Sequence, residues 1–499
     1  MNGYVLYNPA LYFYVFSGCR PRLLCVEGMQ RKSFLSALLK KIRATDLVLI
    51  AIGCVFYLWA CLDDLYRLLV YILAVYLLGI LLKKTRGKYI TVHQAECEGG
   101  EHRVSLALPI LFLSVLFTVA ALIHFKYTGM LSEILGFLLK DTVTLPSIIA
   151  PLGISFITFS AISYLADIYY GKADPGSLID CALYITFFPK VVSGPIVLWR
   201  DFSAQMRTHA VSLSRISDGI GRVMIGCAKK LILADTFGAV IASVPQEMDA
   251  LTAAGIGLLY MLQIYYDFSG YSDIAIGLSG MLGFEMKENF NFPYLSTSIT
   301  EFWRRWHISL GTWFREYIYF PLGGSRKGKV RTVVNIAVVF LLTGIWHGAG
   351  WTYMLWGIVN GVCNVAEKLL SGCKIYEKTP KALKWLATMT VTYFCWGLFR
   401  FPTFEAFRAW LRVMLGITRF AEIPYSAAYY FDTRITVLVI VAALGATVWG
   451  LPAVQRLSDR VKTHPAGYLL SQTVRMLLFV VAMLFMINSD YSPFIYFQY

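Results

Sequence analysis

Long apolar stretches, separated by short polar or basic segments, run through most of this chain. The clearest approach the ~20 mainly apolar residues that a membrane-spanning helix needs, and they cover 46–62, 65–82, 104–123, 145–169, 251–282, 333–347, 351–370, 383–401, 435–451 and 474–487. Two further apolar pieces, 178–198 and 219–244, contain Gly and Lys, and the first also contains Pro, which is typical of broken or re-entrant segments. The pattern predicts an all-α polytopic membrane protein with about ten or eleven transmembrane helices, accompanied by re-entrant and interfacial helices.

The polar segments predict the orientation of these helices. Lysines and arginines gather in 31–43 and 83–103. Both segments are expected to be cytoplasmic, because cytoplasmic loops carry an excess of these residues. The apolar stretch 4–17 is short for a crossing and lacks the basic start of a signal peptide. We expect it to be embedded in the membrane or to lie at its interface.

Composition supports the membrane class and excludes several others. Apolar residues make up 57% of the 499 positions and charged residues only 15%, with a mean hydropathy of +0.60. A soluble domain carries about 25% charged residues, so an ordinary water-soluble enzyme is excluded. The net charge of +15 would suggest a nucleic-acid partner in a soluble protein. Here the basic residues lie in loops between apolar stretches, which favours a lipid bilayer and no nucleic acid.

Two of the seven histidines lie in a context that suggests chemistry. The first, His307, lies within 297–324. Ser298 followed three residues later by Glu301 predicts a helix start, and Pro321 before two glycines predicts its end.

The predicted helix over 297–324 is amphipathic, with His307 at the boundary between its two faces. Its apolar face includes Trp303 and Trp306, and its polar face includes Arg304 and Arg305. Such a helix is too polar on one side to cross lipid, so we expect it to lie along the interface or to line a wet cavity. The alternative is an anchor helix in which His307 only bonds a neighbour.

The second histidine, His347, follows Trp346 at the end of an apolar run that starts after a basic loop. The run 333–347 has 15 residues, which places His347 about 20 Å into the bilayer at ~1.5 Å per residue. An ionisable group at that depth by default marks a cavity or pathway. A neutral imidazole there can accept a proton as a general base. The alternative is a packed core histidine bonded to a carbonyl.

Two other features invite a functional interpretation. The stretch 323–329 has the spacing of a phosphate-binding P-loop, but Val330 replaces the required Ser or Thr and no βαβ context surrounds it. We interpret it as a basic cytoplasmic loop near the phosphates of an acyl donor. Asp267 and Asp273 are candidate ion ligands of a transporter, although structural roles are at least as well supported because they do not share a helix face well.

Several long motifs in order resemble the membrane-bound O-acyltransferases, in particular the bacterial branch similar to alginate O-acetyltransferase. They read FFPKVVSGPIVLWRDF (187–202), GCAKKLILAD (226–235), YYDFSGYSDIAIGLSGMLGF (265–284), ENFNFPYLSTSITEFWRRWHISLGTWFREYIYFPLGGSRKG (288–328), LLTGIWHGAGWTYMLWGIVNG (341–361) and SPFIYFQY (492–499). The resemblance covers 45–499, as one acyltransferase domain, whereas 1–44 match poorly.

The resemblance implies helices arranged around a central tunnel and two family histidines that map onto His307 and His347. His347 would be the general base, while His307 or the Trp and Arg side chains beside it would position the chain or stabilise an oxyanion. The residues expected to line the substrate path or tunnel are Trp303, Arg304, Arg305, Trp306, Trp346 and Asp267. Those expected to contact donor phosphates are Arg326, Lys327, Lys329 and Arg331.

The resemblance also implies the reaction. An acetyl group would pass from a cytoplasmic thioester such as acetyl-CoA toward hydroxyls of an extracytoplasmic polysaccharide. It would pass through an exported or membrane-anchored SGNH-type acetyltransferase. The expected location is the bacterial cytoplasmic (inner) membrane, with no metal and no bound cofactor required. Alternatives are a teichoic acid D-alanyl transferase supplied by an acylated carrier protein, an ion-coupled transporter and a catalytically inactive scaffold.

Overall fold

The computed structural model describes residues 44–60, 62–93, 101–140, 143, 145 and 150–488. The predicted short segment 4–17, the basic run 31–43 and the closing motif 492–499 lie outside these residues. The described residues form two compact units, which we treat separately. The first comprises the chain up to Ala210 with Leu282–Glu285, and the second Val211–Met281 with Met286 onward. A single acyltransferase domain over 45–499 stays a prediction.

The first unit is built from helices and one β-hairpin. Its elements are α4 (Ala44–Ala60), α5 (Leu62–Thr85), β1 (Tyr89–His93), β2 (Glu101–Ser105), α6 (Ala107–Lys126), α7 (Thr128–Leu139), α8 (Ile154–Tyr169), α9 (Leu178–Thr186), α10 (Phe188–Val191) and α11 (Trp199–Gln205). The core of this unit is α8, in which every residue from Phe156 to Ile168 is buried. It packs against α5, α6, α9 and α11.

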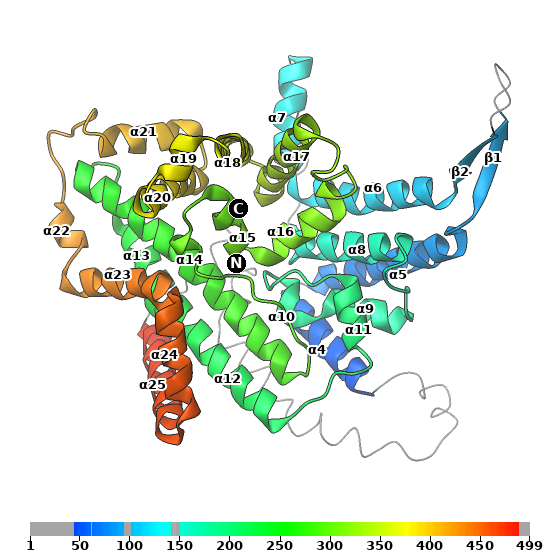
Figure 1. The fold of residues 1–499 in the computed structure, drawn as a ribbon, viewed down its shortest axis with the longest axis horizontal. Helices are drawn as coiled ribbons and strands as arrows, with labels where there is room; N and C mark the ends of the chain where they lie inside the picture. Colours follow the sequence, from blue (N-terminus) through cyan, green and yellow to red (C-terminus); the bar gives the residue numbers. More distant parts are fainter. Residues whose placement is uncertain are drawn as a thin grey trace. The chain divides into compact units, whose positions relative to one another are not determined.

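The hairpin is the main departure of this unit from the predicted all-helical pattern. Strands β1 and β2 pair antiparallel with Tyr89 opposite Ser105, and they extend from the ends of α5 and α6 (Figure 1). The sequence analysis predicted only a polar cytoplasmic loop over these residues. Strand β1 and the first three residues of β2 come from that polar segment, whereas Val104 and Ser105 begin the predicted apolar stretch 104–123.

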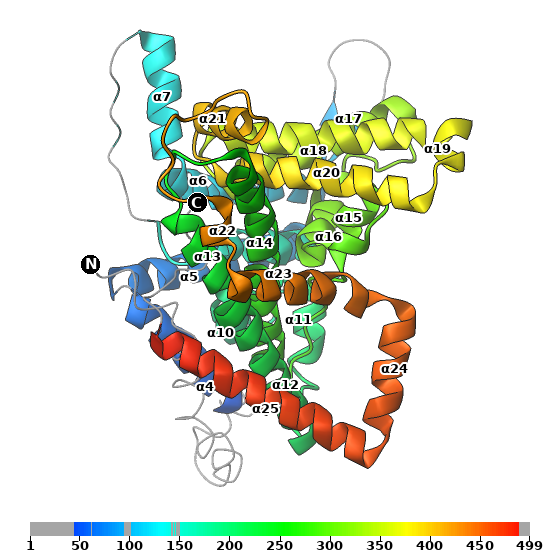
Figure 2. The same ribbon diagram turned by 90° about the vertical axis from the view of Figure 1, so that its left-hand side faces the viewer.

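The described residues of the second unit contain helices and loops but no strand. Its elements are α12 (Leu213–Ala228), the π-helical η3 (Lys229–Ala234), α13 (Asp235–Ser243), α14 (Ala250–Met281), η4 (Pro293–Leu295), α15 (Ile299–Arg305), α16 (Ile308–Phe314), the π-helical η5 (Arg315–Tyr319), α17 (Lys329–His347), α18 (Trp351–Leu370), α19 (Lys374–Lys378), α20 (Lys381–Arg400), α21 (Phe404–Met414), α22 (Ala427–Tyr430), α23 (Thr433–Ala446), η6 (Val448–Gly450), α24 (Pro452–Thr463) and α25 (Pro465–Asn488). Helices α18 and α20 run side by side, with α17 packed against α18 (Figure 2).

Helix α14 forms the centre of the second unit. It is 32 residues long and contacts α12, α13, α20 and α21. The crossing with α12 is close, since a Cβ atom on Gly226 would lie 2.5 Å from the carbonyl oxygen of Gly270. Only glycine permits backbones to approach to this distance.

The polytopic class is confirmed by five helices within the described part of the chain that are long and apolar enough to cross a membrane. They cover Asp64–Thr85, Ala107–Lys126, Lys329–His347, Thr433–Gly450 and Pro465–Asn488. Between 6% and 33% of each hydrophobic window is buried inside the protein, so most of their apolar side chains face outward, as a bilayer requires. The total of ten or eleven crossings stays a prediction.

Nearly all of the predicted apolar stretches coincide with helices, and the exception has a local cause. Among the described residues of the stretch 145–169, the helix covers Ile154–Tyr169. Pro151 and Gly153 precede that helix, and Gly153 takes a left-handed conformation with φ of 67°. Proline is not tolerated inside a helix, so this span begins later than its hydropathy suggests. The two broken pieces are confirmed: 178–198 splits into α9 and α10, and 219–244 is interrupted by η3.

Helices α17 and α18 are held together by a second close crossing. A Cβ atom on Gly357 would lie 2.5 Å from the carbonyl oxygen of Phe340, and one on Gly344 would lie 2.5 Å from that of Tyr353. The two helices therefore pack backbone to backbone just before α17 ends.

We predict that Gly357→Ala lowers the free energy of unfolding by about 1–3 kcal/mol, because the added methyl group forces the two backbones apart. Thermal unfolding of the purified protein in detergent measures this. Gly280→Ala in α14 is the matched control, since a Cβ atom there has no heavy atom within 4 Å. Equal melting temperatures for the two variants would show that the α17–α18 crossing tolerates a side chain.

Candidate active site

His307 lies at a break between two short helices. Helix α15 ends at Arg305 and α16 begins at Ile308. His307 itself has φ of 46° and ψ of 53°, which is the left-handed region that few non-glycine residues adopt. The predicted single helix over 297–324 is therefore wrong in its middle.

The ends of that predicted helix are confirmed. The Ser298 hydroxyl accepts a hydrogen bond from the Glu301 amide at 3.0 Å, which caps the start of α15. The Glu301 carboxylate accepts a hydrogen bond from the Thr297 amide at 2.9 Å. The helical segment ends with η5 at Tyr319, ahead of Pro321.

The side chain of Asn289 holds the chain at the His307 break. Its Oδ1 accepts from the Ser309 hydroxyl at 2.8 Å and the Ser309 amide at 3.2 Å, and it lies 3.1 Å from Nδ1 of His307. The main-chain carbonyl of Asn289 accepts from the Ile308 amide at 2.9 Å. These bonds replace the helical hydrogen bonds that the break removes.

The same contacts determine which nitrogen of His307 carries hydrogen. A backbone amide can only donate, so the Asn289 atom beside the Ser309 amide is its oxygen, and that oxygen accepts from Nδ1 of His307. Nε2 then presents a lone pair, and it is buried without a hydrogen-bond partner in the described structure. Burial lowers the pKa of His307 to about 3. The imidazole is neutral at neutral pH, with a basic nitrogen available to a ligand.

His347 ends α17 inside an aromatic box. Its ring lies 4.8 Å from that of Trp346, 5.0 Å from that of Trp356 and 5.1 Å from that of Phe399, measured between ring centroids. The last two contacts are edge-on, at 89° and 85°. The side chain is buried, as expected for a histidine that the α17 span carries into the membrane.

Trp346 connects the two histidines. Its ring centroid lies 6.2 Å from that of His307 and 4.8 Å from that of His347. Both imidazoles therefore lie against one indole, although they are 40 residues apart in the sequence. The structure brings together the two histidines and Trp346.

Indole N–H groups are the second polar feature of this region. The Nε1 atoms of Trp303, Trp356 and Trp396 are buried and lack a hydrogen-bond acceptor within the described residues. The rings are contiguous, with Trp303 5.5 Å and Trp396 6.1 Å from Trp356. A buried indole normally finds an acceptor, so these donors are suited to oxygen atoms of a substrate.

The other predicted site residues have varied surroundings. Trp306 stacks on Phe302 in the same aromatic cluster. Arg304 is exposed, and Arg305 pairs with Glu301 at 2.8 Å. Asp267, expected on the substrate path, forms an ion pair with Lys230 at 2.9 Å.

The basic loop lies at the start of α17, at the opposite end of that helix from His347. All four of its predicted phosphate contacts are exposed: Arg326, Lys327, Lys329 and Arg331. Helix α17 has 19 residues, so its two ends are about 28 Å apart.

Sequence analysis did not single out Asn289, Trp356 or Phe399. Asn289 lies within the motif 288–328, and an Asn flanked by Glu and Phe resembles any loop residue. Its role depends on packing against a segment 18 residues away. Trp356 and Phe399 belong to apolar helices, where the default interpretation of an aromatic residue is core packing.

Comparison with known proteins places these residues in a family. The model of the membrane-bound O-acyltransferase family matches residues 172–404. A probable alginate O-acetylase of Pseudomonas putida is 35% identical over 78% of this chain and 84% of its own length. The chain belongs to the membrane-bound O-acyltransferase family. This acyltransferase is thus a multi-pass membrane enzyme that uses an acyl donor.

Other relatives of this acyltransferase are named for different activities. A peptidoglycan O-acetyltransferase of Helicobacter pylori is 32% identical over 62% of this chain and 64% of its own length. A teichoic acid D-alanyltransferase of Bacillus subtilis is 30% identical over 51% of this chain and 69% of its own length. The matched family region contains both histidines, Asn289 and the three tryptophans.

We predict that Asn289→Ala lowers the acyl-transfer rate of this enzyme by about ten- to hundredfold, because His307 loses the acceptor that fixes its tautomer and ring orientation. Initial rates per folded molecule measure the effect. Asn335→Ala is the control, since this equally buried amide donates instead to the Gly324 carbonyl at 2.9 Å. An equal loss of rate in both variants would assign Asn289 a purely structural role.

Proposed function

We propose that this enzyme transfers acetyl groups from a cytoplasmic thioester, acetyl-CoA, toward hydroxyls of an extracytoplasmic polysaccharide. The transfer would take place in the bacterial cytoplasmic membrane. The observation that carries the proposal is the pair of buried imidazoles in contact with Trp346, one of which presents an unpartnered basic nitrogen. The relatives named as O-acetylases and O-acetyltransferases support acetyl as the group transferred.

His347 is the proposed general base. It would remove the proton from an acceptor hydroxyl as the hydroxyl oxygen attacks the thioester carbonyl. The resulting tetrahedral oxyanion collapses, the C–S bond breaks, and the thiolate takes up the proton from the imidazolium. The ester bond formed replaces the thioester bond broken, and no oxidant or metal enters the balance.

His307 fits the hydroxyl side of this reaction rather than the oxyanion side. A neutral imidazole with its hydrogen on Nδ1 can only accept at Nε2, so it can hold the hydroxyl hydrogen but cannot donate to an oxyanion. This favours positioning of the acceptor as its role. The Asn289 contact that fixes the tautomer supports this division of roles.

Indole N–H groups are the proposed oxyanion donors. Trp356 lies edge-on to His347, and its buried Nε1 has no acceptor in the described structure. A preorganised donor in a water-excluded site stabilises developing negative charge by about 3 kcal/mol. Trp303, in contact with Trp356, is the second donor.

The donor and the acceptor would approach from different sides. Arg326, Lys327, Lys329 and Arg331 are the proposed contacts of the CoA phosphates, as exposed cations on a loop expected to be cytoplasmic. The acetyl group would leave on the other side to an exported or membrane-anchored SGNH-type acetyltransferase, which would modify the polysaccharide.

The alternative functions differ in their support. Because one relative is a teichoic acid D-alanyltransferase, an acylated carrier protein is the alternative acyl donor to be tested. The transporter hypothesis rested on Asp267 and Asp273 as candidate ion ligands. Asp267 pairs with Lys230, and Asp273 pairs with Lys229 and Arg222. Carboxylates that are held by lysine and arginine are not disposed to bind a transported cation.

We predict that His347→Ala lowers acetylation by about a hundredfold or more, the usual contribution of a general base. The acetyl ester content of the polysaccharide measures the effect, with membrane insertion followed in parallel. His464→Ala is the matched control, because His464 is exposed at the end of α24. Full acetylation by the His347 variant would refute the assignment of the base.

The identity of the acyl donor is tested by supplying radiolabelled acetyl-CoA to the purified protein. We expect hydrolysis or transfer of the label by the wild type and loss of both in His347→Ala. A parallel reaction supplies a D-alanyl group on a carrier protein. Activity with the acylated carrier alone would replace the acetyl proposal by the D-alanyl one.

A further inference from the structure

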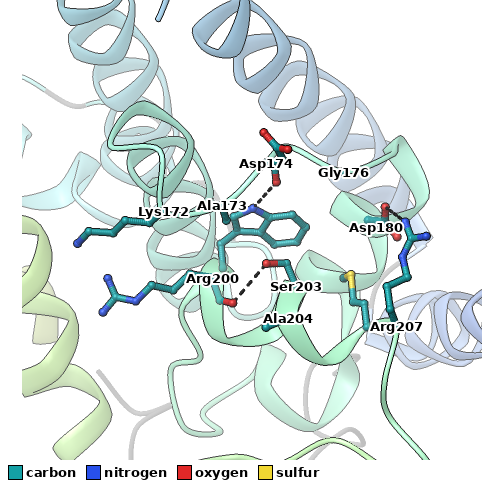
Figure 3. Close-up of a pocket in the computed structure, with 11 residues that line it drawn as sticks. Lys172, Ala173, Asp174, Gly176, Asp180, Arg200, Ser203, Ala204 and Arg207 are labelled. Atoms are coloured by element: carbon teal, nitrogen blue, oxygen red, sulfur yellow. Dashed lines mark hydrogen bonds and ion pairs between the residues drawn. The ribbon is translucent and has the colours of Figure 1, made fainter.

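A pocket in the first unit is lined by arginines that already have carboxylate partners. Arg200 and Arg207 both belong to this lining (Figure 3). The Arg200 guanidinium lies 3.8 Å from the carboxylate of Asp167 and 3.9 Å from that of Asp201. Arg207 lies 3.6 Å from the carboxylate of Asp180. These arginines are therefore not available to an anionic ligand.

In the second unit, the residue that holds His307 is itself held by helix α14. The Oδ1 atom of Asn289 faces His307, and the Nδ2 atom of the same amide donates to the hydroxyl of Ser272 at 3.1 Å. Both Asn289 and Ser272 are buried, and Ser272 belongs to α14. The two ends of one amide group thus connect α14 to His307.

Two more contacts tie the same loop to α14. Glu288 accepts from Nη1 of Arg222 in α12 at 2.6 Å, and Nε of that arginine donates to Asp273 of α14 at 3.0 Å. Phe290 packs edge-on against Phe268 of α14, with ring centroids 5.1 Å apart. Three consecutive loop residues are therefore fixed to one short stretch of α14, either directly or through Arg222.

The same stretch of α14 contacts the ring of His307. Phe268 meets the imidazole edge-on, at 4.6 Å between centroids and at 87°. Phe268 and Ser272 are four residues apart, so they lie on the same face of the helix. One face of α14 consequently supports the ring of His307 through Phe268 and the acceptor of its Nδ1 hydrogen through Ser272.

We propose that Ser272 is a positioning residue for His307 and acts through Asn289. The Ser272 hydroxyl holds the amide so that Oδ1 of Asn289 stays aimed at Nδ1 of His307. This arrangement keeps the ring hydrogen on Nδ1 and leaves Nε2 able to accept from the acceptor hydroxyl. The inference rests on the proposed role of His307 in acyl transfer.

Loss of the Ser272 hydroxyl would leave a buried amide donor without its acceptor. A buried unpaired donor is unfavourable, so the amide of Asn289 would reorient toward another acceptor and draw Oδ1 away from His307. The ring hydrogen would then no longer be held on Nδ1. An imidazole with its hydrogen on Nε2 cannot accept a hydrogen bond at that atom.

The variant Ser272→Ala tests the proposal in the purified full chain. Initial rates of acyl transfer per folded molecule are measured for this substitution in the wild-type and in the Asn289→Ala background. The matched control is Ser279→Ala, a buried serine of the same helix whose hydroxyl has no hydrogen-bond partner in the described structure. Ser272→Thr restores the hydroxyl, and thermal unfolding reports the folding of each variant.

We expect Ser272→Ala to lower kcat about three- to tenfold in the wild-type background, the effect of one lost hydrogen bond, and to leave the KM for the acyl donor unchanged. In the Asn289→Ala background the same substitution should cause no further loss, because the effects of residues that act through one another are not additive. Ser272→Thr and Ser279→Ala should keep most of the wild-type rate.

The proposal is overturned if Ser272→Ala has the wild-type rate or causes the same fold-loss in both backgrounds. It is also overturned if Ser272→Thr or Ser279→Ala is as slow as Ser272→Ala. The comparison uses whichever donor the wild type accepts, acetyl-CoA or an acylated carrier protein. Failure of the acetyl or His347 assignment therefore leaves the coupling measurable, and failure of the coupling leaves both assignments untouched.

Discussion

The conformation of the chain at His307 depends on one side-chain carbonyl, Oδ1 of Asn289, which accepts from His307 and from both donors of Ser309. The left-handed conformation of His307 costs about 1–3 kcal/mol. Three hydrogen bonds of about 1 kcal/mol each offset that cost. The break between α15 and α16 is therefore stable, and it turns His307 inward with Nε2 unpartnered instead of leaving it on the boundary of a continuous helix.

Close helix packing supplies the other half of the site. Helices α17 and α18 approach through Gly344 and Gly357, and this crossing sets Trp356 edge-on to His347. The aromatic rings exclude water from both imidazoles. The glycines and the tryptophans thus act together, since bulkier residues at the crossing would separate the rings.

Local signals in the sequence were sufficient for most of the helices and for the identities of the two histidines. Hydropathy predicted α17, and the capping serine predicted the start of α15. The break at His307 was not predictable, because it depends on Asn289, which is distant in sequence and has no distinctive pattern around it. The ion pair of Asp267 with Lys230 was not predictable either, because the two side chains meet only when η3 and α14 pack together.

The distribution of charge follows from what each region must bind. His307 contacts an amide, a hydroxyl and aromatic rings, and His347 contacts aromatic rings. Among the described residues of the second unit, buried charges such as Lys230 are paired, here with Asp235 and Asp267. An unpaired charge beside the imidazoles would shift their protonation and incur a large desolvation cost. Neutral groups around the imidazoles avoid both of these effects. The cations that attract phosphates are therefore best placed at exposed loops, away from the reacting carbonyl.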